Sequence, residues 1–154
     1  MNRGLAQARS LLFVPATRLE RISKAFDAGA DAVIVDLEDA VPVDSKDTAR
    51  AAFKEFLPQL SVHQRARLLV RINAVATPWF DADLALIVPA VAQGLGAVML
   101  PKSELPLALR ALVERLGPSG RVVPLIESLA GLDQADLLAR ESRVLRLDHR
   151  HRQQ

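Results

Sequence analysis

The chain has 154 residues, enough for one domain with its own core, and it contains no cysteine, which excludes a disulfide framework and thiolate metal sites. Its net charge of +2 arises in residues 140–154, where five arginines outnumber two acids, so the rest of the chain sums to −1 and lacks the basic stripe of a nucleic-acid-binding protein. No apolar run approaches the ~20 residues that cross a bilayer, and no signal peptide precedes the first apolar run, so we expect a cytoplasmic protein without membrane or nucleic-acid partners.

Short apolar runs alternate with amphipathic segments of helical period along the chain. The predicted strands span 11–14, 32–35, 68–72, 97–100, 122–126 and 144–147. These runs are apolar without strict alternation, as in parallel strands that are covered on both faces. Repeated strand–helix units predict a parallel α/β sheet with right-handed crossovers. Periodicity alone leaves two architectures open, a doubly wound open sheet and an incomplete (β/α)₈ barrel.

Capping residues predict where two of the helices begin and end. Thr17 and Glu20 have the spacing of a capping box at the start of the first helix, and Gly29 is placed to end that helix. Ser103 is expected to open the helix after the fourth strand, and Gly117 is expected to close it.

Charged side chains follow four of the predicted strands. Asp36 and Glu38 come after the second strand, Arg71 lies at the end of the third, Lys102 follows the fourth, and Glu127 follows the fifth. In barrels and in open α/β sheets, this edge carries the active site. Carboxylates suit a hard cation such as Mg²⁺, and arginine suits a planar carboxylate. The sequence therefore predicts a candidate site at the carboxyl ends of the strands.

Each of these residues also has a purely structural interpretation. Glu127 would favour the N-terminus of the next helix through the helix dipole. Asp36 and Glu38 would cap loops, and Arg71 would be their ion-pair partner. Lys102 fits the structural interpretation most easily. A nucleotide-binding sheet is disfavoured, because no Gly-x-Gly-x-x-Gly or P-loop pattern follows any strand.

An ordered series of motifs resembles the opening of citrate lyase beta-subunit-like proteins of the HpcH/HpaI aldolase family, from residue 9 to about residue 139. The Asp-Leu-Glu-Asp-Ala-Val segment is the most specific of them. The motifs are Arg9-Ser10-Leu11-Leu12-Phe13-Val14-Pro15, Lys24-Ala25, Gly29-Ala30-Asp31, Asp36-Leu37-Glu38-Asp39-Ala40-Val41, Lys46, Ala49-Arg50, Arg71-Ile72-Asn73, Pro101-Lys102 and Pro124-Leu125-Ile126-Glu127-Ser128.

This resemblance implies the N-terminal portion of a (β/α)₈ barrel that uses Mg²⁺ to make or cleave carbon–carbon bonds. The implied substrates are carboxylated hydroxyacyl-CoA thioesters of the citryl-, malyl- or citramalyl-CoA type, or free oxo acids in a related branch. Glu127 is implied as a Mg²⁺ ligand and Arg71 as the clamp for the substrate carboxylate. Asp36 and Glu38 are implied to orient Arg71 and metal-bound waters.

Three further basic residues are implied to bind substrate. They are Lys102, Arg21 and Lys24, and the last two would contact the phosphates of coenzyme A. The resemblance does not assign a general base.

The sequence departs from the family pattern after the fifth unit. A family barrel has eight strands in commonly ~250 residues, whereas we expect here a partial lyase domain at 1–147 and a polar, disordered tail at 148–154. Asp148 lies near the place of the family's second metal ligand, but its context does not match. The edges of an unclosed barrel predict a homo-oligomer. Two interpretations stay open: an active lyase, and an inactive truncated remnant that acts at most as a binding protein.

Overall fold

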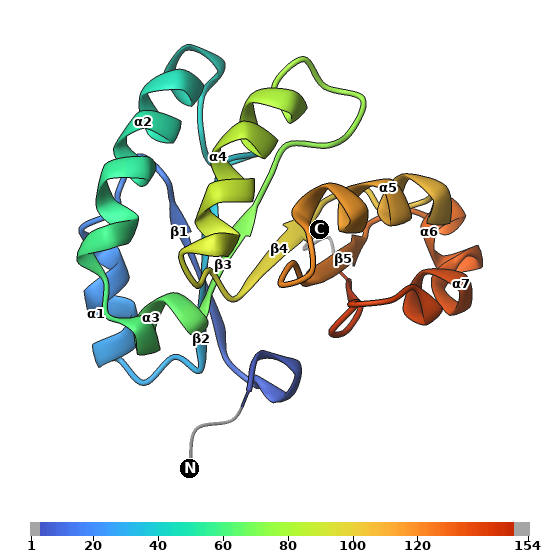
Figure 1. Cartoon of the computed structure of the whole chain (residues 1–154), viewed down its shortest axis with the longest axis horizontal. Helices are drawn as coiled ribbons and strands as arrows, with labels where there is room; N and C mark the ends of the chain where they lie inside the picture. Colours follow the sequence, from blue (N-terminus) through green and yellow to red (C-terminus); the bar gives the residue numbers. More distant parts are fainter. Residues whose placement is uncertain (1–3, 150–154) are drawn as a thin grey trace.

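Six parallel strands follow one another in sequence order across a curled sheet in the computed structural model, which describes residues 4–149 (Figure 1). The strands are β1 (Leu11–Pro15), β2 (Ala32–Asp36), β3 (Leu68–Arg71), β4 (Ala97–Leu100), β5 (Val122–Ile126) and β6 (Asp148–His149). A doubly wound sheet reverses its strand order at a switch point, whereas this order does not reverse. The fold is therefore an incomplete (β/α)₈-type barrel, and the doubly wound alternative is wrong.

Helices connect successive strands on the outside of the curled sheet. Figure 1 shows α1 to α3 grouped beside β1 and β2, and α5 to α7 grouped on the other side beyond β4. The helices are α1 (Arg21–Asp27), α2 (Lys46–Phe56), α3 (Val62–Ala66), α4 (Phe80–Ala92), α5 (Pro106–Leu116), α6 (Leu129–Asp133) and α7 (Ala135–Arg140), with single 3₁₀ turns η1 (Leu5–Gln7), η2 (Val43–Ser45) and η3 (Leu57–Gln59).

Alternate residues of each inner strand pack into two different apolar clusters. In β2, Val33 and Val35 belong to the larger core, which includes helix side chains such as Phe53 of α2. Ala32 and Ile34 belong to a smaller cluster on the opposite, concave face of the sheet. Every residue of β2 is buried, so both faces of the strand select apolar side chains. This explains why the strand sequences lack a polar alternation.

The sixth strand lies further along the chain than the sequence predicts. Val144 makes only an isolated bridge to Val122, and β6 consists of Asp148 and His149, which pair with the end of β5. Leu145 and Leu147 do pack against the two apolar clusters. The apolar run 144–147 therefore indicates burial of these side chains, although the run does not form a hydrogen-bonded strand. The predicted tail therefore begins within a strand, and residues 150–154 lie outside the described residues.

Both glycine helix ends are confirmed, and both predicted helix starts are wrong. Gly29 and Gly117 have φ values of 89° and 78°, which suit glycine after a helix. Glu20 pairs with Arg18 and makes no side-chain cap on α1. Ser103 donates its hydroxyl to the carbonyl of Leu100, while α5 begins three residues later at a proline.

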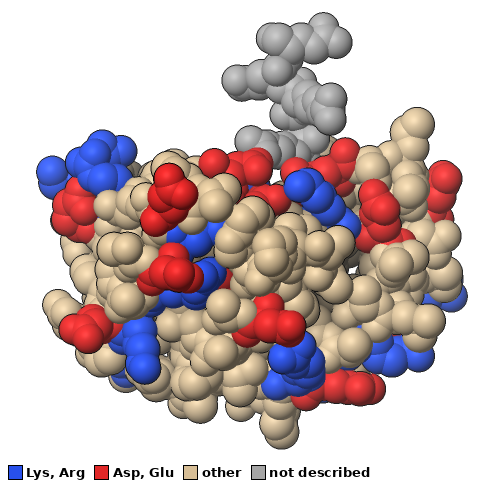
Figure 2. Space-filling model, turned by 90° about the horizontal axis from the view of Figure 1, so that it is seen from above, with Lys and Arg blue, Asp and Glu red and all other residues tan. Residues whose placement is uncertain are grey.

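The surface is mixed in charge on the face that Figure 2 presents, where acidic and basic side chains alternate over a largely uncharged background. Within residues 4–149, no helix combines the length and the apolar character that crossing a membrane requires.

Candidate active site

A buried ion pair joins the ends of β2 and β3. Asp36 and Arg71 stand opposite each other in the parallel register. The Arg71 Nε donates to Asp36 Oδ1 at 2.8 Å and its Nη2 donates to Asp36 Oδ2 at 2.6 Å, which makes a two-pronged contact. The same carboxylate also accepts from the backbone N–H groups of Glu38 and Ala40. Asp36 therefore fixes both the guanidinium and the loop that follows β2.

The loop after β2 presents two more carboxylates to Arg71. Arg71 Nη1 lies 3.3 Å from Glu38 Oε2 and 4.0 Å from Asp39 Oδ2. Glu38 is buried and Asp39 is half exposed. Although Glu38 Oε2 is close to Nη1, it is a buried oxygen without a hydrogen-bond partner. Arg71 is thus surrounded by three acids, and one of them keeps an unsatisfied oxygen.

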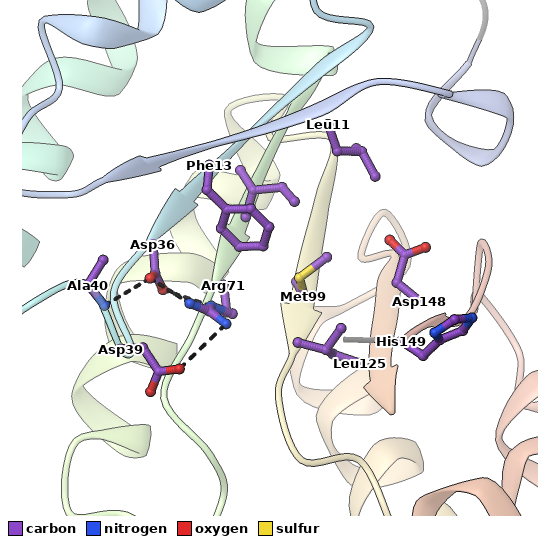
Figure 3. Close-up of a pocket in the computed structure, with 11 residues that line it drawn as sticks. Leu11, Phe13, Asp36, Asp39, Ala40, Arg71, Met99, Leu125, Asp148 and His149 are labelled. Atoms are coloured by element: carbon purple, nitrogen blue, oxygen red, sulfur yellow. Dashed lines mark hydrogen bonds and ion pairs between the residues drawn. The ribbon is translucent and has the colours of Figure 1, made fainter. Parts of the chain in front are cut away.

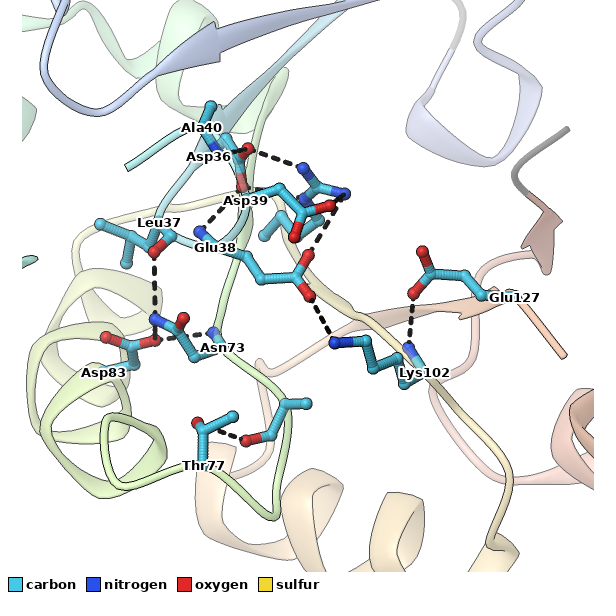
Figure 4. Close-up of polar contacts among 12 residues, drawn as sticks. Asp36, Leu37, Glu38, Asp39, Ala40, Asn73, Thr77, Asp83, Lys102 and Glu127 are labelled. Carbon is cyan, nitrogen blue, oxygen red and sulfur yellow. Dashed lines mark hydrogen bonds and ion pairs between the residues drawn. The ribbon is translucent and has the colours of Figure 1, made fainter. Parts of the chain in front are cut away.

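The loops after β4 and β5 complete the cluster (Figure 4). Lys102 Nζ lies 3.5 Å from Glu38 Oε1, and the Lys102 backbone N–H donates to Glu127 Oε2 at 2.8 Å. We call this set the rim cluster. It consists of Asp36, Glu38, Asp39, Arg71, Lys102 and Glu127.

Burial and charge act against each other within the rim cluster. Burial raises the pKa of Glu38, and the nearby charges of Asp39 and Glu127 raise it further, against Arg71 and Lys102. Burial also opposes the charge of Arg71, but the hydrogen bonds and charge of Asp36, together with the other acids, outweigh it and raise its pKa. Arg71 therefore stays cationic. Burial disfavours the charged form of Glu38, and additional positive charge nearby would stabilise that form.

A hollow of about 690 Å³ opens beside the Asp36–Arg71 ion pair on the concave face of the sheet (Figure 3). Its polar end is formed by Asp36, Asp39 and Arg71, and its apolar wall includes Phe13, whose ring centroid is 4.9 Å from the Arg71 guanidinium carbon. The remaining lining residues are Leu11, Ile34, Ala40, Met99, Leu125, Asp148 and His149. A small molecule with a carboxylate and an apolar part fits this division.

A second buried network of hydrogen bonds, centred on Lys46, holds the backbone of the loop after β2. Lys46 Nζ donates to the carbonyls of Leu37 and Glu38 and to Asn73 Oδ1 at 2.8–3.0 Å. Burial lowers the pKa of Lys46, although the charges of Asp83, Asp36 and Glu38 act in the opposite direction. The network keeps the backbone of the loop in one place, so its acids have fixed positions.

Asp83 of α4 anchors that network. Its carboxylate accepts from the backbone N–H and the side-chain amide of Asn73, both at 2.7 Å, and from Arg50 Nη1 at 2.8 Å. The sequence does not single out Asp83, because an acid in the first turn of a helix has an ordinary explanation in the helix dipole. Its position on the buried face, three residues after Phe80 and four before Ile87, is the signal that marks it as paired.

The structure brings together five of the seven residues that the sequence predicts for the site. Asp36, Glu38, Arg71, Lys102 and Glu127 are the predicted members of the rim cluster.

The other two predicted residues lie elsewhere. Arg21 and Lys24 are exposed on α1, outside the contacts that define the rim cluster, so their coenzyme A contacts stay predictions. Asp148 lines the hollow, but it is paired with Arg146 at 2.8–3.0 Å.

The rim cluster fits a hard divalent cation that keeps part of its water shell. Among residues 4–149, no three or more acidic, histidine or cysteine side chains are grouped so that they could hold a metal ion by themselves. Mg²⁺ does not need one, since it commonly takes one or two carboxylates and fills its other positions with water and substrate oxygens. The buried Glu38 Oε2 has no hydrogen bond, although Arg71 Nη1 lies 3.3 Å from it, and the negative charge of Glu127 also acts on the Glu38 carboxylate, so a cation near these two acids would be stabilised.

Together, the curled parallel sheet and the charged rim at the carboxyl ends of its strands define a (β/α)-barrel protein with a cluster of charged residues at the edge where such barrels carry their active sites. Residues 9–147 match the model of the HpcH/HpaI aldolase/citrate lyase family. The chain belongs to this family.

Relatives agree with this assignment. The chain is 34% identical to a citrate lyase subunit beta-like protein of Deinococcus radiodurans and 35% identical to a (3S)-malyl-CoA thioesterase of Cereibacter sphaeroides, each over 136 residues. These matches cover 86% and 88% of the chain but 45% and 46% of the relatives, so the chain spans about half the length of the curated relatives it matches.

Solved structures show the same fold. A citrate lyase beta subunit of Mycobacterium tuberculosis in complex with oxaloacetate and magnesium superposes with a TM-score of 0.74 at 36% identity, covering 97% of this chain and 60% of that one. CitE from the same organism, in complex with magnesium, acetoacetate and coenzyme A, gives a TM-score of 0.73 at 35% identity, covering 94% of this chain and 49% of that one.

Proposed function

We propose that the chain forms the part of a Mg²⁺-dependent carbon–carbon lyase that binds the metal and the substrate carboxylate, and that it acts on a carboxylated hydroxyacyl-CoA. The observation that carries this proposal is the rim cluster, in which residues from four strand ends are joined by ion pairs and by the hydrogen bond from the Lys102 main-chain N–H to Glu127. Relatives named for magnesium, oxo acids and coenzyme A support it.

Each member of the rim cluster has a role in this proposal. Arg71 uses two of its five N–H groups on Asp36, and Nη1, which lies 3.3 Å from Glu38 Oε2, would turn its remaining N–H to the substrate carboxylate. Asp36 keeps the guanidinium in that orientation, so little ordering remains to be done when substrate binds. Lys102 would add a second positive charge for the carboxylate. Arg21 and Lys24 would lie nearer the coenzyme A phosphates.

Glu127 would be one ligand of Mg²⁺, and Glu38 would hold water molecules on the ion. When bound, Mg²⁺ supplies Lewis-acid polarisation of the carbonyl oxygen and a template for the oxo acid. The apolar side of the hollow, where Phe13 and Met99 lie, would shield the bound substrate from part of the bulk water. Fixed charge at a developing oxyanion is commonly the largest catalytic contribution.

A thioesterase is the second candidate, because a (3S)-malyl-CoA thioesterase is among the relatives. A retro-aldol cleavage of malyl-CoA breaks the bond between C2 and C3 and yields acetyl-CoA and a 2-oxo acid. Hydrolysis of the thioester yields malate and free coenzyme A. The two products separate the candidates, and the inactive remnant yields neither.

Incubating the purified chain with malyl-CoA or citramalyl-CoA and Mg²⁺ is expected to release a 2-oxo acid, detected as its phenylhydrazone. Glu127→Gln is expected to lower that rate about 100-fold, because a charged group at the reaction centre is lost. Glu114→Gln, which neutralises an exposed carboxylate on α5, is the matched control and should leave the rate unchanged. Activity that survives Glu127→Gln would remove its assigned role, and release of free thiol alone would favour the thioesterase.

Two further expectations belong to this proposal. The outer strands β1 and β6 each have one neighbour in the described sheet, and Leu12 and Phe13 of β1 are exposed, which supports self-association through these edges. A cytoplasmic location accords with the absence of cysteine.

A further inference from the structure

Lys46 is a buried cation that joins two loops of the candidate site. It is the first residue of α2 and is only 5% exposed. Its ammonium donates to the carbonyls of Leu37 and Glu38, in the loop after β2, and to the side-chain oxygen of Asn73, in the loop after β3. These three acceptors, at 2.8–3.0 Å, use all three N–H groups of the ammonium. The ammonium therefore fixes the two loops relative to each other.

The joined loops are the ones that follow the Asp36–Arg71 ion pair. Glu38 comes two residues after Asp36, and Asn73 comes two residues after Arg71. Asn73 adds a further connection, because its amide group donates to the Leu37 carbonyl at 3.0 Å (Figure 4). The ends of β2 and β3 are thus connected twice, first by the ion pair and then, two residues further along each chain segment, by hydrogen bonds of the ammonium and of Asn73.

Two local effects oppose a lysine at this place. Burial removes the Lys46 ammonium from water, and the N-terminus of α2 carries a partial positive charge that repels a cation. The face of the Trp79 ring, 4.9 Å from Nζ, offsets part of this cost, and so do the negative charges of Asp83, Asp36 and Glu38. A simple connection between loops does not require a charge, because a neutral amide satisfies carbonyls at a smaller cost of desolvation. The stronger hydrogen bonds of an ammonium indicate that the loops must be placed firmly.

We propose that Lys46 is a positioning residue of the candidate site, which holds the backbone of Glu38 against the loop after β3 so that the Glu38 carboxylate keeps its place beside Arg71. This inference rests on the proposed function, in which that carboxylate holds water on Mg²⁺ and the guanidinium binds substrate. Glu38 Oε2 lies 3.3 Å from Arg71 Nη1, so a shift of the loop would separate the two groups. Among residues 4–149, the lining of the hollow does not include Lys46, so it acts through the residues that it positions.

Lys46→Met tests this role, because methionine keeps an apolar stem and removes the three donated hydrogen bonds. With saturating Mg²⁺, calorimetry is expected to show that the variant binds pyruvate roughly tenfold more weakly than the unmodified chain, as is typical of residues that support a metal site from outside its ligands. Leu112→Ala is the matched control, since it destabilises the core in the second half of α5, outside the two loops. It should bind pyruvate as the unmodified chain does. All titrations contain sucrose, which favours the folded state.

The absence of cysteine from the chain allows the ammonium to be restored chemically. The single thiol of Lys46→Cys is alkylated with bromoethylamine in urea, so that its sulfur forms a bond to carbon and bromide leaves. The product is a lysine analogue with sulfur in place of one methylene, and the chain is then refolded. We expect this aminoethylated chain to bind pyruvate as tightly as an unmodified chain that is unfolded and refolded in the same way.

Three results would overturn this inference and leave the proposed function standing. The first is that Lys46→Met binds pyruvate as tightly as the unmodified chain, or that Leu112→Ala loses as much affinity as Lys46→Met. The second is that the refolded aminoethylated chain does not regain affinity. The third is that Lys46→Met stays unfolded in sucrose, because its side chain would then support the whole fold and not two loops. No pyruvate binding by the unmodified chain with Mg²⁺ would overturn both the inference and the proposed function.

Discussion

Arg71→Met is expected to lower the free energy of unfolding by about 3–5 kcal/mol, because it leaves the buried Asp36 carboxylate without its counter-ion. Both side chains are almost fully buried, at 4% and 1% exposure, so water does not replace the lost contact. Such a loss approaches the whole stability of a small domain, which is commonly ~5–15 kcal/mol. Urea unfolding followed by far-ultraviolet circular dichroism measures it.

Two companion variants show whether the buried pair is responsible. Arg115→Met removes an exposed arginine from its contact with Asp81 and should cost less than about 1 kcal/mol. Adding Asp36→Asn to Arg71→Met removes the uncompensated charge and should restore part of the stability. If Arg71→Met is no more costly than Arg115→Met, the ion pair does not hold the ends of β2 and β3 together.

The second large effect is expected at Asp83. Asp83→Ala should lower the free energy of unfolding by about 3 kcal/mol, because Arg50 and the amide groups of Asn73 lose their shared buried acceptor. The loop after β2 should also loosen, since Asn73 donates to the Leu37 carbonyl and accepts from Lys46. Hydrogen exchange of the loop amides, measured beside urea unfolding, reports both consequences.

Asp81→Ala is the matched control for Asp83→Ala. Both acids lie in the first turn of α4 and both pair with an arginine, so the helix dipole and charge terms are alike. Asp81 is 84% exposed, whereas Asp83 is fully buried. We expect less than about 1 kcal/mol for Asp81→Ala. Similar losses for the two variants would mean that the helix dipole, and not the buried network, explains Asp83.

The strands were predictable because a strand that is buried on both faces consists of an uninterrupted run of apolar residues. The bounds 97–100 and 122–126 agree with β4 and β5. The gathering of Asp36, Arg71 and Glu127 was also predictable, since parallel strands deliver their carboxyl ends to one edge. Both follow from short-range patterns and from a general rule of topology.

Contacts that depend on loop paths were not predictable in the same way. Ser103 has the composition of a helix cap, yet its hydroxyl bonds to the carbonyl of Leu100, which the sequence does not indicate. Between α7 and β6, Arg143 has a φ of 64°, a left-handed conformation for which arginine has no local preference. The Asp83 network joins residues from α2, the loop after β3 and α4, and no single stretch of sequence contains it.

The rim cluster is proposed to hold Mg²⁺ and a substrate carboxylate together. Calorimetric titration of pyruvate into the purified chain, with and without saturating Mg²⁺, tests this most directly. We expect saturable binding of pyruvate when Mg²⁺ is present, and binding at least tenfold weaker without Mg²⁺ or in Glu127→Gln. Equal affinity with and without Mg²⁺, or no binding under either condition, would contradict it.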